Sequence, residues 1–205
     1  MIGILDYGLG NVGAFYNIYK RLNIPVCIVT DAEKIDSIDR LILPGVGSFD
    51  WAMNRLSSSG MLEELNKAVL DREIPILGVC VGMQMMAQGS DEGHLKGLGW
   101  IDASVRHFSK LTNEKIDLPH MGWNDIQVYK EHPLFKNLEK DAIFYFLHSY
   151  YFQEGSDSQI MSRTDYGEVF TSSIFKGNIF GVQFHPEKSH HWGVQLLKNF
   201  SELPC

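Results

Sequence analysis

Short apolar runs alternate with helical patterns through the first half of the chain. The runs predict buried strands at 2–5, 25–29, 41–43 and directly before Cys80. Segments in which apolar residues recur three or four positions apart predict helices at about 11–22, 49–56 and 61–70. Strands that alternate with helices in this way are typical of a parallel sheet covered by helices on both faces.

The second half of the chain reads as strand after strand. Apolar runs bounded by turn residues predict strands at 100–108, 124–128, 142–147, 159–163, 169–175 and 178–184, and an amphipathic helix is predicted at about 192–203. Consecutive strands without helices between them indicate antiparallel additions to the parallel core. We therefore expect an α/β fold of three layers, with a mainly parallel central sheet and antiparallel additions, in one domain over residues 1–205.

Composition narrows the class of protein. The 205 residues, of which 44% are hydrophobic, suffice for one sizeable domain and contain no apolar run of membrane-spanning length. The first predicted strand reaches Asp6 without a basic leader, so we expect no signal peptide. Cys27, Cys80 and Cys205 are widely spaced, which fits a reducing cytoplasm better than a disulfide framework. A net charge of −7 disfavours nucleic acid as a partner.

One cysteine stands in an unusual setting. Cys80 lies between Gly78 and Gly82, where a predicted strand meets an apolar, helix-competent stretch. A sharp turn of this kind exposes a nucleophile, the glycines tolerate the strained backbone and leave room for a substrate, and a helix N-terminus favours the thiolate. The pattern also fits an inert, buried cysteine at a strand end. Cys27 and Cys205 have neither a glycine turn nor a base nearby in sequence, so we expect both to be bystanders.

A nucleophilic cysteine needs a base, and His185 is the best candidate among the eight histidines. It ends a strand-like run and precedes Pro186, which biases it toward an extended backbone. Residues two apart in an extended segment point the same way, so Glu187 is expected to reach the imidazole and fix its tautomer. Taken alone, this pattern is more typical of a surface loop.

Together these residues resemble the class I, or triad, glutamine amidotransferases, and the resemblance covers nearly the whole chain. Six motifs stand in the order of that family: DYGLGN at 6–11, PGVG at 44–47, GVCVGMQ at 78–84, PHMGWN at 119–124, HSY at 148–150 and FHPEKS at 184–189. The likeness is greatest to glutaminase subunits that serve a separate cyclase in histidine biosynthesis.

The resemblance implies a catalytic triad of Cys80, which attacks the glutamine amide, His185, which moves protons, and Glu187, which orients His185. It implies an oxyanion hole formed by backbone N–H groups of the segment around Val46 and Gly47 and of Val81. It further implies that glutamine is held by Gly47, Gln84, Ser149 and Tyr150. The resemblance implies neither a cofactor nor a metal.

The resemblance also implies a partner, because a chain of this length leaves no room for a synthase domain. The expected partner is a (β/α)8-barrel cyclase subunit in a heterodimer, which joins ammonia to a ribulosyl aminoimidazole nucleotide and yields imidazole glycerol phosphate. Asn11, Trp123, Asn124 and Lys188 match the family's interface side. Similar subunits also feed enzymes that amidinate surface-polysaccharide sugars, and the segments 148–152 and 189–193 leave that alternative open.

Two other readings compete with this one. Gly8, Gly10 and Gly13 form the Gly-x-Gly-x-x-Gly spacing of a dinucleotide-binding loop, with Asp31 at nearly the expected distance. Asp6 and Tyr7 separate the strand from these glycines, however, and a carboxylate there would repel a pyrophosphate. A metal site can be drawn from the histidines at 185, 190 and 191 with the glutamate at 187, but we expect the two adjacent histidines to be solvated and no metal to bind. The methionines at 83, 85 and 86 are expected to pack in the core.

Overall fold

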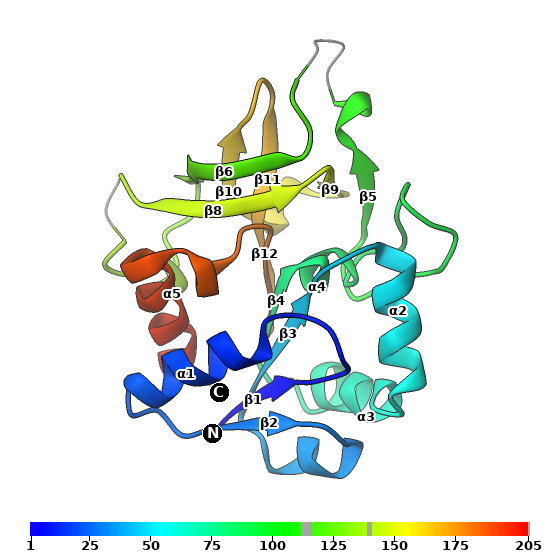
Figure 1. Cartoon of the computed structure of the whole chain (residues 1–205), viewed down its shortest axis with the longest axis vertical. Coiled ribbons are helices and arrows are strands. Elements are labelled where there is room, and N and C mark those ends of the chain that lie inside the picture. Colours follow the sequence, from blue (N-terminus) through cyan, green and yellow to red (C-terminus); the bar gives the residue numbers. More distant parts are fainter. Residues whose placement is uncertain (112–115, 139–140, 205) are drawn as a thin grey trace.

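The computed structural model describes residues 1–111, 116–138 and 141–204. A mixed sheet with the strand order β2-β1-β3-β4-β12-β11-β10-β7 runs through its centre (Figure 1). The parallel strands of this sheet are β1 Ile2–Leu5, β2 Val26–Val29, β3 Arg40–Gly45, β4 Ile76–Cys80 and β12 Ile179–Val182. The strands β4 and β12 are buried over their whole length, as expected for strands at the centre of a covered sheet.

The remaining strands are antiparallel. The sheet continues through β11 Val169–Lys176, β10 Ile160–Asp165 and β7 Gln127–Val128, and β9 Tyr150–Glu154 joins β5 Ala103–His107 to β11. The strands β6 His120–Asp125 and β8 Ile143–His148 form a separate two-stranded ribbon, which crosses the top of the molecule in Figure 1.

Helices cover the parallel strands on both sides (Figure 1). One side carries α1 Val12–Arg21 and α5 His190–Glu202, and the other carries α2 Phe49–Ser58 and α3 Leu62–Asn66. The connection from β1 to β2, which contains α1, runs toward one edge of the sheet. The connection from β3 to β4, which contains α2 and α3, runs in the opposite direction. Right-handed crossovers that run in opposite directions place their helices on opposite faces of the sheet. No helix in the described ranges is both long and apolar enough to span a bilayer.

This architecture confirms the predicted α/β fold with a mainly parallel central sheet. The strand β9 was not predicted, because only Ser149 separates it from β8 and no cluster of turn residues marks the change of pairing partner. The predicted strand at 124–128 is instead the end of β6 followed by β7. The predicted helix at 61–70 ends as α3 at Asn66 and continues as a wider π turn over Lys67–Asp71.

The parallel strands bring distant segments to one edge of the sheet. Gly45 at the end of β3 pairs with Cys80 at the end of β4, and Val182 near the end of β12 pairs with Val79. The loops that follow these strands therefore meet at the carboxyl edge of the sheet, which is where ligands bind in open α/β folds.

Candidate active site

Cys80 occupies the sharp turn from β4 to the single-turn helix α4 Val81–Gln84. Its backbone has φ +54° and ψ −114°, a strained conformation for any residue other than glycine. The residue is 4% exposed, and its sulfur lies 3.8 Å from the Leu147 carbonyl oxygen and 3.7 Å from Nε2 of Gln183. The predicted nucleophile turn is present, and the strain is carried by the cysteine itself.

Gly78 and Gly82 were expected to tolerate a strained backbone, but the structure shows that they instead allow close packing. Neither has a positive φ. A Cβ at Gly82 would lie 2.0 Å from the Leu43 carbonyl oxygen, and one at Gly78 would lie 2.8 Å from the Gly82 carbonyl oxygen. Gly45 meets the same helix from β3, where a Cβ would lie 2.2 Å from the Gly82 nitrogen. These glycines let α4 press against the ends of β3 and β4.

His185 and Glu187 follow β12 and lie beside the cysteine turn. Nδ1 of His185 is 2.9 Å from Oε1 of Glu187, and both side chains are almost fully buried. The imidazole follows an extended backbone as predicted, but Glu187 reaches it from a 3-10 turn over Pro186–Lys188 and not from an extended segment. The backbone N–H of His185 donates to the Tyr145 carbonyl, which ties the turn to β8. Within the turn, Ser189 Oγ donates to the His185 carbonyl.

The electrostatics of this group favour a protonated imidazole. Burial by itself lowers the pKa of His185, but hydrogen bonds and charge attraction from Cys80 and Glu187 outweigh it and raise the pKa to about 10. Such a rise is what a thiolate–imidazolium pair with a carboxylate behind it produces. The site therefore has a nucleophile and a proton donor side by side.

A cavity of about 190 Å³ opens over the sulfur. Its volume suits a small metabolite rather than a nucleotide. Every residue predicted for the oxyanion hole and for substrate binding lies along it, and Gly47 has the positive φ of +83° that favours glycine. The cavity is lined by Val46, Gly47, Cys80, Val81, Gln84, Glu92, Leu147, His148, Ser149, Tyr150, His185 and Lys188.

The model of the glutamine amidotransferase class-I family matches residues 4–202. The chain belongs to the class I glutamine amidotransferases.

Two relatives of this amidotransferase carry the same name. It is 52% identical to the imidazole glycerol phosphate synthase subunit HisH of Bdellovibrio bacteriovorus, over 99% of this chain and 100% of that one. It is 48% identical to the HisH subunit of Leptospira interrogans, with the same coverage of 99% and 100%. Among solved structures, PurLQS from Thermotoga maritima matches with a TM-score of 0.74 at 18% identity, over 97% of this chain and 96% of that one. This last likeness shows the fold alone.

Two residues along the amidotransferase site, Glu92 and Gln183, carried no signal that we recognised in the sequence, and His148 lay in a recognised motif but was given no role. Glu92 and His148 line the cavity, and Gln183 lies behind it, with its Oε1 accepting from Nε2 of Gln84 at 3.0 Å. The Gln84 amide also donates to the Tyr150 carbonyl at 3.3 Å, which fixes its orientation. Gln183 directly precedes the motif at 184–189, but Glu92 comes from a polar loop with no motif of its own.

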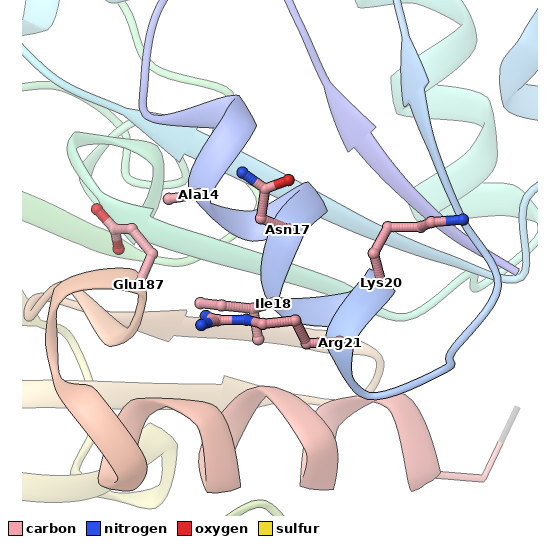
Figure 2. Close-up of a pocket in the computed structure, with 6 residues that line it drawn as sticks. All are labelled: Ala14, Asn17, Ile18, Lys20, Arg21 and Glu187. Carbon is pink, nitrogen blue, oxygen red and sulfur yellow. The ribbon is translucent and has the colours of Figure 1, made fainter.

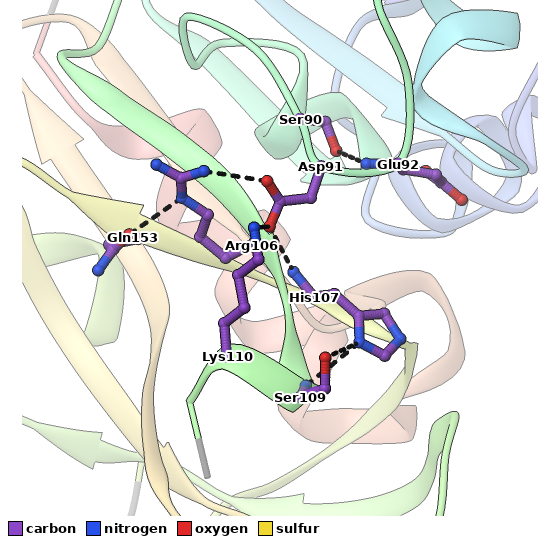
Figure 3. A network of polar contacts seen from close by, with 8 residues as sticks. All are labelled: Ser90, Asp91, Glu92, Arg106, His107, Ser109, Lys110 and Gln153. Atoms are coloured by element: carbon purple, nitrogen blue, oxygen red, sulfur yellow. Dashed lines mark hydrogen bonds and ion pairs between the residues drawn. The ribbon is translucent and has the colours of Figure 1, made fainter. Parts of the chain in front are cut away.

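A charged network holds the loop that carries Glu92 (Figure 3). The Asp91 carboxylate pairs with Arg106 at 2.9 Å and with Lys110 at 2.9 Å, and it accepts the His107 N–H. Burial alone raises the pKa of Asp91, but these three donors hold it below its ordinary value. Glu92 itself turns the other way, and its Oε2 accepts the Phe49 N–H at the start of α2, at 2.8 Å. The carboxylate of Glu92 is thereby kept at the cavity.

The residues predicted for the interface differ in exposure and in the contacts that they make. Trp123 is 43% exposed on the outer side of the ribbon and stacks on His190, with ring centroids 5.0 Å apart. Lys188 lies near the Tyr145 ring and also lines the cavity. Asn124 is half-buried, and its amide donates inward to the Asp165 carbonyl at 2.8 Å. Asn11 is exposed at the N-terminus of α1.

Glu187 also borders a surface groove on the far side of the triad. Figure 2 shows it opposite Ala14 and Asn17 of α1, with the Arg21 side chain below. Within the described residues, its buried Oε2 has no hydrogen-bond partner. The carboxylate is therefore held through Oε1 alone, by His185.

The contacts around the Gly-x-Gly-x-x-Gly loop argue against dinucleotide binding. In the Gly-x-Gly-x-x-Gly loop, Asp6 Oδ1 accepts the Gly8 N–H, and a Cβ at Gly8 would lie 2.1 Å from Nη2 of Arg55. The loop is therefore occupied by the protein's own side chains, and Asp31 pairs with Lys34 at 2.7 Å.

The cluster considered for a metal does not form one. Within the parts of the chain that the structure covers, no group of three or more candidate ligands is arranged for a metal ion. His190 and His191 are exposed, as expected, although His190 also stacks on Trp123. Met83, Met85 and Met86 are fully buried in the core, as predicted, and the Cys205 assignment falls outside the described residues.

Proposed function

We propose that this amidotransferase is the glutaminase subunit of an imidazole glycerol phosphate synthase, and that it hydrolyses glutamine through a thioester on Cys80. The observation that carries the proposal is the strained Cys80 beside the buried His185–Glu187 pair, at the mouth of a cavity of about 190 Å³. The names of the relatives, at 52% and 48% identity over full length, support the assignment to this synthase.

In the proposed reaction, the Cys80 thiolate attacks the side-chain amide carbon of glutamine. The negative charge that develops on the amide oxygen is stabilised by the Val81 N–H and by an N–H of the Val46–Gly47 segment. The imidazolium of His185 gives its proton to the departing ammonia, which leaves a γ-glutamyl thioester on Cys80. A water molecule then loses a proton to His185 and attacks the thioester, which releases glutamate and restores the thiolate. Glu187 orients the imidazole and stabilises its charged form.

The rest of the cavity suits the polar ends of glutamine. Glu92 offers a carboxylate to the α-ammonium group, since Oε2 is held by α2 and Oε1 remains to accept. Gln84, with its amide nitrogen already bonded to Tyr150 and Gln183, offers its Oε1 as an acceptor. Gly47 and the Ser149–Tyr150 backbone complete the walls that we assign to substrate. No cofactor or metal takes part in this mechanism.

The partner we propose is a (β/α)8-barrel cyclase subunit that docks on the outer face of the ribbon to form a heterodimer. On this face Met121 is 64% exposed, Trp123 43%, Ile143 41% and Leu147 36%, an apolar patch that is unusual for a free surface. Leu147 also approaches the Cys80 sulfur through its carbonyl oxygen, so the patch lies next to the site that makes ammonia. Asn11 and Lys188 would contact the partner beyond the ribbon.

We further propose that residues 1–205 act as one glutaminase domain, and that the protein works in the cytoplasm, where the Cys80 thiol stays reduced. The deciding test of the pathway is to mix the chain with its cyclase-type partner, glutamine and the ribulosyl aminoimidazole nucleotide. Formation of imidazole glycerol phosphate is expected. Glutamate release that responds only to a sugar-amidinating partner would instead assign the subunit to polysaccharide synthesis.

A further inference from the structure

Two buried histidines connect the ribbon to the substrate cavity. His148 at the end of β8 and His120 at the start of β6 are 6% and 2% exposed, and they face each other across the ribbon as a register pair. The His120 ring is stacked between Phe146 and Tyr166, with centroid distances of 4.7 and 3.9 Å. The mechanism proposed above uses neither imidazole, although the His148 ring lines the cavity.

The hydrogen bonds of these rings fix both tautomers. Nδ1 of His148 lies 2.7 Å from the Tyr150 carbonyl oxygen, which can only accept, so Nδ1 carries the proton. Nε2 of His148 is then an acceptor, and Nδ1 of His120 donates to it at 3.1 Å. Nε2 of His120 in turn accepts from the Asn124 amide at 3.3 Å. The orientation of that amide is set independently by its bond to the Asp165 carbonyl at 2.8 Å.

This directed chain requires both rings to be neutral, and their surroundings keep them so. Burial, together with the nearby His120 and His185, outweighs the hydrogen bond to the Tyr150 carbonyl and lowers the pKa of His148 to about 3. Burial lowers the pKa of His120 to about 4. Near neutral pH the chain is therefore uncharged and runs from Asn124 through His120 and His148 to Tyr150.

The end of the chain lies at the substrate. The Tyr150 carbonyl accepts from His148 and also from Nε2 of Gln84, so one peptide oxygen is held from two directions. Tyr150, which carries this carbonyl, and Ser149, which precedes it, both line the cavity. We propose that His148 is a positioning residue for glutamine: backed by His120 and Asn124, it fixes the Ser149–Tyr150 backbone against which the substrate lies. This inference rests on the glutaminase function proposed above.

Side-chain shape gives a graded test. Asparagine places its amide nitrogen near the position of Nδ1, so His148→Asn retains the donor to Tyr150. His148→Phe keeps the ring but leaves the Tyr150 carbonyl without this donor. We expect His148→Phe to raise KM for glutamine about tenfold or more, with kcat within about threefold, and His148→Asn to stay within about threefold of wild-type KM. His132→Asn, at the N-terminus of a remote 3-10 turn, is the control for loss of a partly buried imidazole.

Equal KM values for His148→Phe and the wild type, or the same defect in His148→Asn as in His148→Phe, would overturn the proposal. Nitrogen-15 NMR of the wild-type imidazoles provides a readout independent of activity and of variant folding. It should show His148 and His120 both neutral and protonated at Nδ1, and an Nε2–H tautomer for His148 would also overturn the proposal. If the wild type with its partner releases no glutamate while the tautomers are as stated, the glutaminase function fails and the hydrogen-bond chain stands.

Discussion

At the scale of single residues, the proposed chemistry depends on a charge arrangement that Cys80, His185 and Glu187 each help to maintain. Cys80 holds a backbone with positive φ, and the glycines at 78 and 82 on either side of it are closely packed. His185 stays protonated because the sulfur and the carboxylate outweigh the effect of burial. Replacing Cys80 or Glu187 should therefore change the pKa of the His185 imidazole while the fold is kept.

Glu187→Gln tests this arrangement through pH. Glu187 is one of the two groups that raise the pKa of His185 to about 10, so its neutral replacement should lower that pKa. The imidazolium is present below its pKa, and activity should fall as pH rises through it, so the alkaline limb of kcat/KM should move to lower pH. The measurement is the pH profile of glutamate release with the partner present. An unmoved limb, or a greater loss of activity than in His185→Ala, would assign Glu187 another role.

At the scale of elements, the close approach of α4 to the ends of β3 and β4 builds the site. Glycine is needed at 45, 78 and 82 because backbone atoms of one element lie where a Cβ of another would stand. Sequence spacing showed that the turn existed, but only the assembled sheet shows which glycines are strained and which are crowded.

Gly82→Ala should destabilise the protein, because its Cβ would lie 2.0 Å from the Leu43 carbonyl oxygen. Overpacking of this kind costs about 1–3 kcal/mol, and each kcal/mol lowers Tm by roughly 2–4 °C in a protein of this size. Gly13→Ala in α1 is the matched control, since a Cβ there meets nothing within 4 Å. Thermal unfolding of both variants checks the prediction, and a Gly82→Ala variant as stable as Gly13→Ala would contradict the packing argument.

The Asp91 network should position the loop that presents Glu92. In Asp91→Asn the charged contacts with Arg106 and Lys110 are weakened, and Glu92 should become less well placed for the α-ammonium of glutamine. We expect KM to rise by up to about fivefold with little change in kcat, since partly exposed pairs contribute about 1 kcal/mol or less. Steady-state kinetics at low and moderate salt measure this. A fall in kcat at constant KM would show that the network acts on the chemistry instead.

Much of the parallel core and of the candidate site could be predicted from the sequence. Strand and helix periodicity located the parallel core, and the motifs located Cys80, His185 and the residues along the cavity. The strand β9 was missed because a single residue, Ser149, separates it from β8. Glu92 and Gln183 were missed for a different reason: each acquires its role only from partners far away in sequence, namely Phe49 for Glu92 and Gln84 for Gln183.

At the scale of the whole molecule, the apolar outer face of the ribbon lies beside the site where ammonia forms. We propose that the isolated chain is nearly idle and that docking of the partner completes the oxyanion hole through the peptide at Val46, which has Gly45 and Gly47 on either side. That contribution is about 3–4 kcal/mol, so the partner with its acceptor ligand should raise glutamate release by roughly two to three powers of ten. Equal turnover with and without the partner would remove the gating proposal.

Met121→Asp tests the docking face itself. Met121 is 64% exposed, so the isolated variant should unfold at the wild-type temperature, while a buried charge at the interface should weaken partner binding at least about tenfold. Leu70→Asp, 53% exposed on the helical side away from the ribbon, is the matched control. Calorimetric titration with the cyclase subunit measures both. Unchanged affinity for Met121→Asp would place the interface elsewhere.

The thioester on Cys80 is the central claim, and covalent labelling tests it most directly. The chain with its partner is treated with a diazo-ketone analogue of glutamine, and the modified peptide is mapped by mass spectrometry. A single label on Cys80 is predicted, together with its absence from a folded Cys80→Ser variant whose glutaminase activity has fallen by several orders of magnitude. Labelling at Cys27 or Cys205, or glutaminase activity that survives in Cys80→Ser, would contradict the account.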